Sequence, residues 1–143
     1  MKKTGGLLLM GLVPLAVGYL LNFVMMALPV PPFFLGAVML VLWGYYCHKR
    51  AADDTSAVLQ TLMMNAVGTL MLILVLVQEL ILGAYWGNYA GLITQVYFLP
   101  CLPLISVLAH IFTRVTALWA LYLIEWAFML AASFIGCRAA RKR

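Results

Sequence analysis

The carboxyl group of Glu125 lies in the middle of the apolar run LYLIEWAFML, residues 121–130. A charged side chain at the centre of a bilayer costs at least about 2.5 kcal/mol, so this carboxyl must be protonated, paired or in contact with water. The sequence offers no basic residue at the same depth. We therefore expect a neutral, hydrogen-bonding acid. Such an acid either carries protons across the membrane or fastens two helices together, and the sequence leaves both roles open.

Three polar residues are the candidates for contact with Glu125 within one chain: Asn65, Thr69 and Tyr122. Asn65 and Thr69 lie in a stripe of small and polar residues on one face of the apolar run at residues 57–84. Tyr122 lies close to the line of Glu125 in a similar stripe on its own helix, and we expect both stripes to face protein and the opposite, hydrocarbon sides to face lipid. Together the four residues predict a polar path through the membrane. The alternatives are contact with Glu125 of a second copy and hydrogen bonds that only join helices. The sequence favours a joining bond for Asn65.

Glu79 and Arg114 lie near the outer surface of the predicted membrane region. Their opposite charges and similar depth predict an ion pair. The pair is either a structural contact, which we favour, or a gate at the outer mouth of the path. Glu79 and Glu125 differ in depth by a large part of the bilayer, so they are poor candidates for paired acid and base catalysis.

Motifs for catalysis and for metal binding are missing from the sequence. There is no GxSxG, HExxH, GxGxxG or P-loop pattern. His110 has no partners in a metal-binding spacing. The nine methionines are scattered along the chain, as expected for adaptable packing. We predict no catalytic residue, no metal and no cofactor, and the sequence disfavours an enzyme.

The composition indicates which kind of element must hold these residues. The chain has 143 residues, of which 66% are hydrophobic and 9% are charged, which is typical of an integral membrane protein. Its formal net charge is +5, but the basic residues lie at the ends of apolar runs. There they orient helices in the membrane and form no face for nucleic acid. The expected partners are the lipid bilayer and either further copies of the chain or a larger membrane protein complex.

Four apolar runs predict transmembrane helices, which need about 20 residues each. Pro14 should kink the first helix, which we expect to stay uncleaved, and the PVPP stretch should end it. The polar loop HKRAADDTS separates the second helix from the third, and Asp54, Thr55 or Ser56 can cap the third. The four predicted spans cover residues 5–28, 32–48, 57–84 and 113–137.

Residues 92–112 form a further apolar run, which would make a fifth crossing. Five crossings would leave the basic tail RAARKR outside, whereas four place it in the cytoplasm with the N-terminal lysines, as the positive-inside rule prefers. The prolines of FLPCLP, residues 98–103, would also break a straight helix at its middle. We therefore predict a single all-α domain, a bundle of four transmembrane helices with both termini cytoplasmic. Residues 92–112 then form an outer interfacial or re-entrant segment.

Aromatic residues are expected at the two membrane interfaces, where their amphipathic rings are most stable. Tyr85, Trp86, Tyr89 and Tyr97 predict an outer belt. Trp43, Tyr45 and Tyr46 predict an inner one, at the end of the second helix. The lysine pair at the start and the short loops favour a multi-pass protein of the bacterial inner membrane.

Three functions are compatible with these features. The first is an oligomeric transporter or channel for a small solute or ion, with Glu125, Asn65, Thr69 and Tyr122 along its path. The second is a non-catalytic accessory subunit of a larger membrane complex. The third and weakest is a lipid-interacting protein, suggested by the aromatic residues of segment 92–112. We prefer transport, because an ionisable residue inside the membrane is most often functional.

Overall fold

The structure is a computed structural model that describes residues 2–27, 31–51, 55–83, 89–112 and 117–141. Every regular element in these ranges is helical, which confirms the all-α prediction for the described part of the chain. The elements in chain order are α1 (Lys2–Met10), α2 (Val13–Ala27), α3 (Pro32–Arg50), α4 (Ala57–Met64), α5 (Ala66–Leu76), the π-helical turn η1 (Val77–Ile81), α6 (Tyr89–Phe98), α7 (Leu102–Phe112) and α8 (Leu118–Ala140).

Two helices are long and apolar enough to cross a membrane: the helix over Gly5–Ala27 and α8. Two bent pairs also qualify if each is one span, namely α4 with α5 and η1, and α6 with α7. The described residues therefore hold two to four candidate spans, as expected of a membrane protein. The second predicted crossing, α3, is not among them. Its last turn consists of His48, Lys49 and Arg50, whose polar side chains lower the mean hydropathy of the helix. The count of four crossings remains a prediction.

The first candidate span is interrupted at Gly11 and Leu12, between α1 and α2. The N–H groups of these residues donate to the carbonyls of Leu8 and Leu9, at 3.0 and 3.1 Å, in a tighter three-residue pattern. Pro14 follows after Val13 and has no N–H, so it cannot complete the α-helical series of hydrogen bonds across this point. The helix is therefore interrupted where the sequence predicted a kink, and the kink itself stays a prediction.

The third predicted span consists of two pieces that meet at Asn65, where α4 is bent by 56° from the helix over Ala66–Ile81. Asn65 has φ −102° and ψ 10°, so its backbone is not α-helical. The start of α4 is capped by Ser56, whose hydroxyl accepts a hydrogen bond from the Leu59 amide at 3.2 Å. Ser56 was one of the three caps predicted from the sequence.

The segment at residues 92–112 is bent by 74° between α6 and α7. At the end of α6, the Leu99 amide donates to the Gln95 carbonyl oxygen at 2.8 Å. At the start of α7, the Ile105 amide donates to the Cys101 carbonyl oxygen at 3.0 Å. Pro100 and Pro103 lack the N–H groups that would continue one helix through this point. The break predicted from FLPCLP is therefore confirmed. We call residues 99–101 the α6–α7 break.

The buried and exposed faces follow the helical periodicity of the sequence. On α5, Leu70 and Ile73 are exposed, whereas Gly68 and Leu72 are buried. The small and polar stripe of this helix thus faces protein and its hydrocarbon side faces outward, as predicted. The same division holds on α8, where the buried residues are Leu121, Tyr122, Glu125, Met129, Ser133, Gly136 and Cys137.

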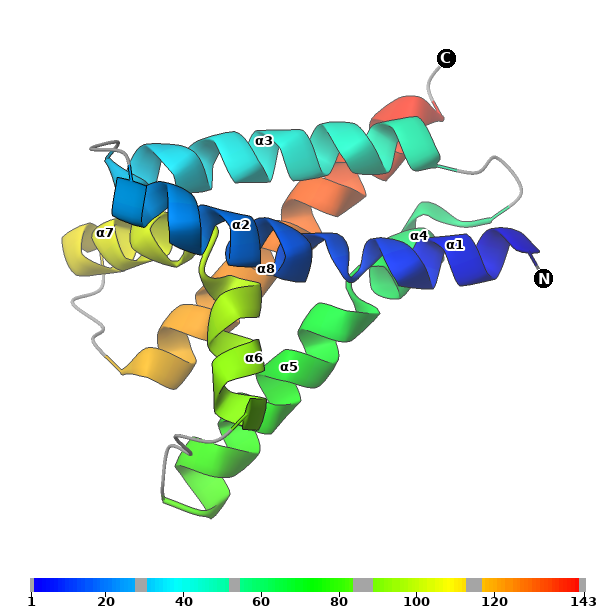
Figure 1. The fold of residues 1–143 in the computed structure, drawn as a ribbon. Helices are drawn as coiled ribbons and strands as arrows, with labels where there is room; N and C mark the ends of the chain where they lie inside the picture. Colours follow the sequence, from blue (N-terminus) through cyan, green and yellow to red (C-terminus); the bar gives the residue numbers. More distant parts are fainter. Residues whose placement is uncertain (1, 28–30, 52–54, 84–88, 113–116, 142–143) are drawn as a thin grey trace.

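Helices α3 and α8 pack closely along their C-terminal halves (Figure 1). A Cβ atom on Gly136 would collide with the carbonyl oxygen of Gly44, so the two backbones meet directly. His48 strengthens the contact, because its Nδ1 donates to the carbonyl oxygen of Gly136 at 3.3 Å. Glycines on facing helices therefore determine how near these two elements approach.

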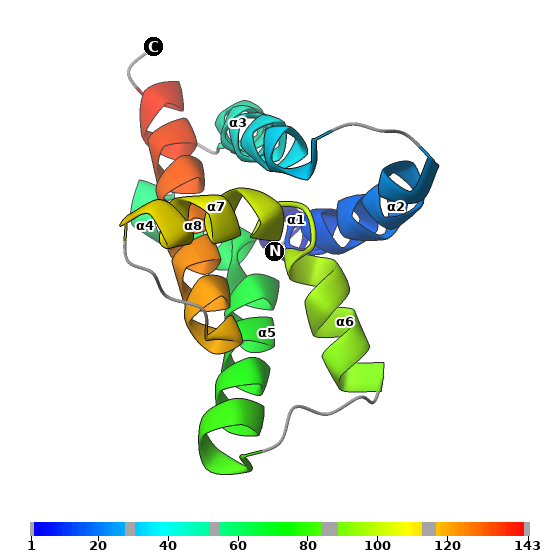
Figure 2. The same ribbon diagram turned by 90° about the vertical axis from the view of Figure 1, so that its left-hand side faces the viewer.

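Several helix ends lie together on one side of the molecule, and others lie on the opposite side. Helix α1 begins, α3 ends, α4 begins and α8 ends on the right-hand side of Figure 1. The start of α3 and the whole of α7 lie on the opposite side. Figure 2 looks from that opposite side, where α7 crosses in front of α8.

Candidate intramembrane site at Glu125

Glu125 is completely enclosed by protein, with 0% of its side chain exposed. It lies closer to the start of α8 than to its end. The run at residues 113–137 predicted a central position, and the difference arises because α8 begins only at Leu118 and continues to Ala140. Burial of Glu125 against other helices agrees with the predicted protein-facing side of α8.

The polar neighbours of Glu125 come from the α6–α7 break and the helix before it. Tyr97, near the end of α6, and Cys101, in the break, both interact electrostatically with the Glu125 carboxyl group. The carboxyl also faces the backbone of Cys101, but the geometry falls short of a hydrogen bond. Neither carboxyl oxygen has a hydrogen-bond partner among the described residues, and the buried Tyr97 hydroxyl has none either.

Aromatic rings close the site on one side. The ring of Tyr122 stacks on Phe98, with centroids 4.9 Å apart and planes 22° apart. Phe98 in turn meets Tyr97 edge to face at 5.1 Å. These rings and Glu125 are all buried, and electrostatic interactions are stronger in such a water-excluded interior.

Helix α3 supports the α6–α7 break from another side. A Cβ atom on Gly36 would lie only 3.2 Å from the carbonyl oxygen of Pro100 and 3.3 Å from the Cα atom of Cys101. The Cys101 thiol donates to the Gly36 carbonyl oxygen at 3.8 Å. The glycine therefore allows the break to rest on the α3 backbone itself.

Asn65 belongs to a second polar group, farther along α8. Its Nδ2 donates to the Ser133 hydroxyl at 2.8 Å and to the Thr61 carbonyl oxygen at 2.8 Å. The one proton of the Ser133 hydroxyl is shared between the carbonyl oxygens of Met129 and Leu130, at 2.9 Å each. This Asn65–Ser133 junction joins the α4–α5 bend to α8, which confirms the interhelical hydrogen bond predicted for Asn65.

Thr69 lies between the two polar groups. Its hydroxyl donates to the Asn65 carbonyl oxygen at 3.0 Å and accepts a hydrogen bond from Nε1 of Trp126 at 3.1 Å. Asn65 and Thr69 thus bond to other residues of α8, and Glu125 bonds to neither of them. Tyr122 contributes to the aromatic wall of the site. The polar path through these four residues remains a prediction.

Glu79 lies in η1 and is partly buried. The Leu82 amide donates to the Val77 carbonyl oxygen at 3.0 Å, a five-residue spacing that marks the π-helical turn. Such turns are frequent at functional sites. Arg114 lies outside the described residues, so the ion pair with Glu79 and the outer gate both remain predictions.

Tyr97 and Cys101 are the site residues that the sequence did not single out. Tyr97 was predicted in the outer aromatic belt, and this is wrong, since it is 1% exposed and its hydroxyl lies over Gly68. Trp43, predicted in the inner belt, is likewise buried. Gly68, in the polar stripe of α5, could have indicated the buried position of Tyr97, because a glycine on a packing face leaves room for a large side chain from a neighbouring helix.

Buried sulfur atoms lie on the other half of α8. The Cys137 thiol lies 3.9 Å from the Met64 sulfur, and all three cysteines are free and buried. Within the described ranges, no three histidine, cysteine, aspartate or glutamate side chains gather in a way that could hold a metal ion. The sulfur atoms therefore contribute to packing in this region.

No known protein family, curated protein or solved structure matches this chain. The residues of the Glu125 site, their burial and their hydrogen bonds are therefore the basis for inferring a function.

Proposed function

We propose that the protein transports a small solute or ion across the membrane, and that protonation of Glu125 is coupled to movement of the α6–α7 break. One observation carries the proposal: a fully buried carboxyl group, with no hydrogen-bond partner in the described part of the chain, lies beside an interrupted helix. Buried polar groups are nearly always hydrogen-bonded, so an exception calls for a special role. Interrupted helices are also the usual place for substrate and ion sites in transporters.

Ionisation of Glu125 requires a change in its surroundings. A carboxylate that is sealed from water and has no partner is far less stable than the neutral acid. Release of the proton must therefore coincide with the arrival of water, a cation or new hydrogen-bond donors. The first turn of α7 can supply donors, because the amides at the start of a helix have no carbonyl partner within it. Opening of the α6–α7 break would admit a small solute or ion in exchange for the proton.

The transport path is proposed to pass through an assembly of two or more copies. A bundle of this size fills its interior with side chains, and the aromatic wall beside Glu125 is one example. Several copies can enclose a path that a single copy is too small to form. The expected partners are therefore further copies of the chain, embedded in the lipid bilayer.

The proposed topology has four crossings, with both termini in the cytoplasm of a bacterial cell and the α6–α7 segment re-entrant from outside. Its support is the placement of helix ends, since α1 begins and α3 and α8 end on one side of the molecule (Figure 1). The exposed basic residues Lys49, Arg50, Arg138 and Arg141 also lie at these ends. A basic cytoplasmic side is what the positive-inside rule requires.

Proton flux into liposomes tests the proposal. The full chain, reconstituted and driven by a pH gradient, should carry protons, and Glu125→Gln should reduce the flux at least about tenfold because the amide cannot release a proton. The matched control is Glu79→Gln, which removes the other carboxyl group of the predicted membrane region and should retain most of the flux. Circular dichroism and gel filtration check that both variants fold. Equal flux in wild type and Glu125→Gln would refute the proposal.

The second candidate function is that of an accessory subunit in a larger membrane complex. The Asn65–Ser133 junction favours it, because this junction explains several polar residues as fasteners between helices without any transport role. The particle mass after mild detergent extraction distinguishes the two functions. A homo-oligomer agrees with transport, whereas one copy bound to a larger partner, together with inert liposomes, agrees with the accessory role.

The third candidate, lipid binding beside FLPCLP, loses its main support. Phe98, Pro100 and Cys101 are buried, and Gly36 of α3 covers this stretch. An acyl chain therefore has no free surface at Phe98, Pro100 or Cys101.

A further inference from the structure

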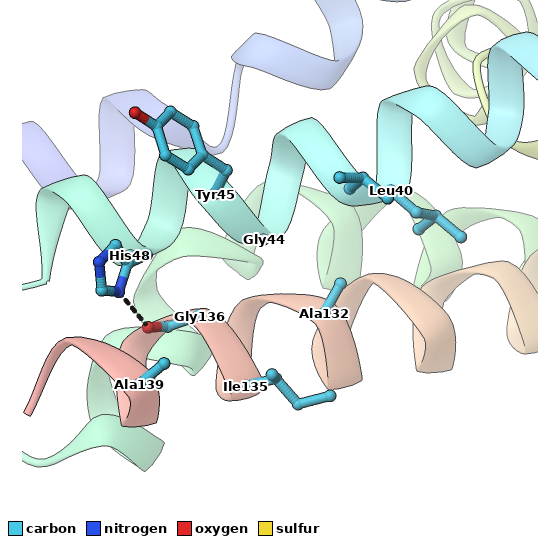
Figure 3. Close-up of a pocket in the computed structure, with 9 residues that line it drawn as sticks. Leu40, Gly44, Tyr45, His48, Ala132, Ile135, Gly136 and Ala139 are labelled. Carbon is cyan, nitrogen blue, oxygen red and sulfur yellow. Dashed lines mark hydrogen bonds between the residues drawn. The ribbon is translucent and has the colours of Figure 1, made fainter. Parts of the chain in front are cut away.

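A groove of about 500 Å³ runs between α3 and α8 on the outside of the bundle (Figure 3). Its volume lies within the range of about 300–1,000 Å³ typical of small-molecule sites. The lining is almost entirely apolar and the groove is open along one side. The residues that shape it are Leu40, Gly44 and Tyr45 of α3 and Ala132, Ile135 and Ala139 of α8.

Small residues form the floor of the groove and large ones form its walls. Gly44 and Gly136 let the two backbones touch, and the methyl groups of Ala132 and Ala139 add little volume above them. Leu40 of α3 and Ile135 of α8 rise on the two sides, as the close-up shows. An open apolar trough of this volume, with a floor of small residues, suits one hydrocarbon chain.

The cytoplasmic end of the groove, in the proposed topology, is basic. Lys49 lies over the ring of Tyr45, with its Nζ 5.6 Å from the ring centroid, and Tyr45 lines the groove. Arg138 is exposed on α8, one turn beyond Ile135. His48 lies at the same end and bonds to the Gly136 carbonyl oxygen. The charged groups are thus concentrated where the apolar trough ends.

We infer that this groove is a binding site for one anionic phospholipid. One acyl chain occupies the trough, and the phosphate group lies against Lys49 and Arg138. The match of charge and shape favours this occupant, since basic pockets between helices on the cytoplasmic side suit anionic headgroups. A zwitterionic lipid would fill the same trough but would gain less from the two cations. The site is separate from Glu125, and its existence does not depend on the proposed transport function.

Native mass spectrometry of the full chain tests the inference. The protein is extracted in mild detergent with equal amounts of phosphatidylglycerol and phosphatidylcholine that carry the same acyl chains. One phosphatidylglycerol should remain bound per chain, at least about fivefold more often than phosphatidylcholine, because one cation near the membrane surface changes anionic lipid binding by about that factor. Equal retention of the two lipids would overturn the inference.

Two pairs of variants locate the site. Ala139→Phe fills the trough from an exposed position and should abolish retention, whereas Ala131→Phe, exposed on α8 but outside the groove, should not. Lys49→Gln should lower retention about fivefold, while Arg50→Gln should have little effect, since Arg50 lies over Tyr46 and away from the groove. Equal losses for the two alanine variants would mean that lipid retention does not depend on the trough. Equal losses for the lysine and arginine variants would mean general attraction to a basic surface. Either result would overturn the site. If Ala139→Phe fails to fold, the lysine and arginine pair decides.

Discussion

The Asn65–Ser133 junction and the Glu125 site both involve α8 and are similarly buried, yet they differ in hydrogen bonding. The Asn65 side chain donates two hydrogen bonds, and the Ser133 hydroxyl accepts one of them and shares its own proton between two carbonyls. The Glu125 carboxyl has no hydrogen bond among the described residues. Buried polar residues of this helical bundle are therefore of two kinds, one with its hydrogen bonds satisfied and one without.

The difference indicates that the Asn65–Ser133 junction holds helices together, whereas the Glu125 site is able to change its conformation. A satisfied network stabilises a single arrangement, whereas an unsatisfied buried group costs free energy in the state that holds it. Stability measurements on matched variants can therefore test the comparison without any assay of transport.

The largest stability effect is expected at the junction. Asn65→Ala should lower the free energy of unfolding by about 2 kcal/mol, because it removes two buried hydrogen bonds and leaves a cavity. Reversible unfolding in mixed detergent micelles measures this change. Asn22→Ala, on an exposed face of α2, is the control and should be close to neutral. A decrease in the free energy of unfolding of less than about 0.5 kcal/mol for Asn65→Ala would mean that the junction contributes little to holding the helices together.

A change of opposite sign is expected at the other region. Glu125→Leu should raise the free energy of unfolding by about 1 kcal/mol, since an apolar side chain of similar size has no unsatisfied group to bury. The same unfolding assay applies. Destabilisation by more than about 1 kcal/mol would show that the carboxyl group holds helices together, and the contrast between the two regions would disappear.

The smallest effect is expected at Thr69, which lies between the two regions. Thr69→Val removes the hydrogen bond from Trp126 and should cost about 0.6 kcal/mol, the average for such bonds between membrane helices. A double-mutant cycle with Trp126→Phe isolates this term. A coupling energy near zero would leave the two regions energetically independent.

The sequence predicted the features that depend on local chemistry. The interruption before Pro14, the break at FLPCLP and the Ser56 cap follow from missing N–H groups and from a hydroxyl at the right position. The protein-facing sides of α5 and α8 follow from periodicity. Each of these conclusions needs only residues close together in the chain.

The sequence did not predict which faces meet. Periodicity places Asn65 and Ser133 on packing faces, but it does not say that they face one another. Tyr97 looked like an interface residue because tyrosine is common there, and its true position depends on the space above Gly68. Such pairings arise from the fit of small residues on one helix to large ones on another, which no single segment encodes.

Gly36 and His48 lie on opposite halves of the same straight helix, about 18 Å apart at 1.5 Å per residue. The first supports the α6–α7 break, and the second holds the end of α8. Because α3 is one continuous helix with contacts near both ends, a tilt at its Gly36 end displaces its His48 end. A movement of the α6–α7 break would therefore be transmitted through α3 to the contact between His48 and the end of α8.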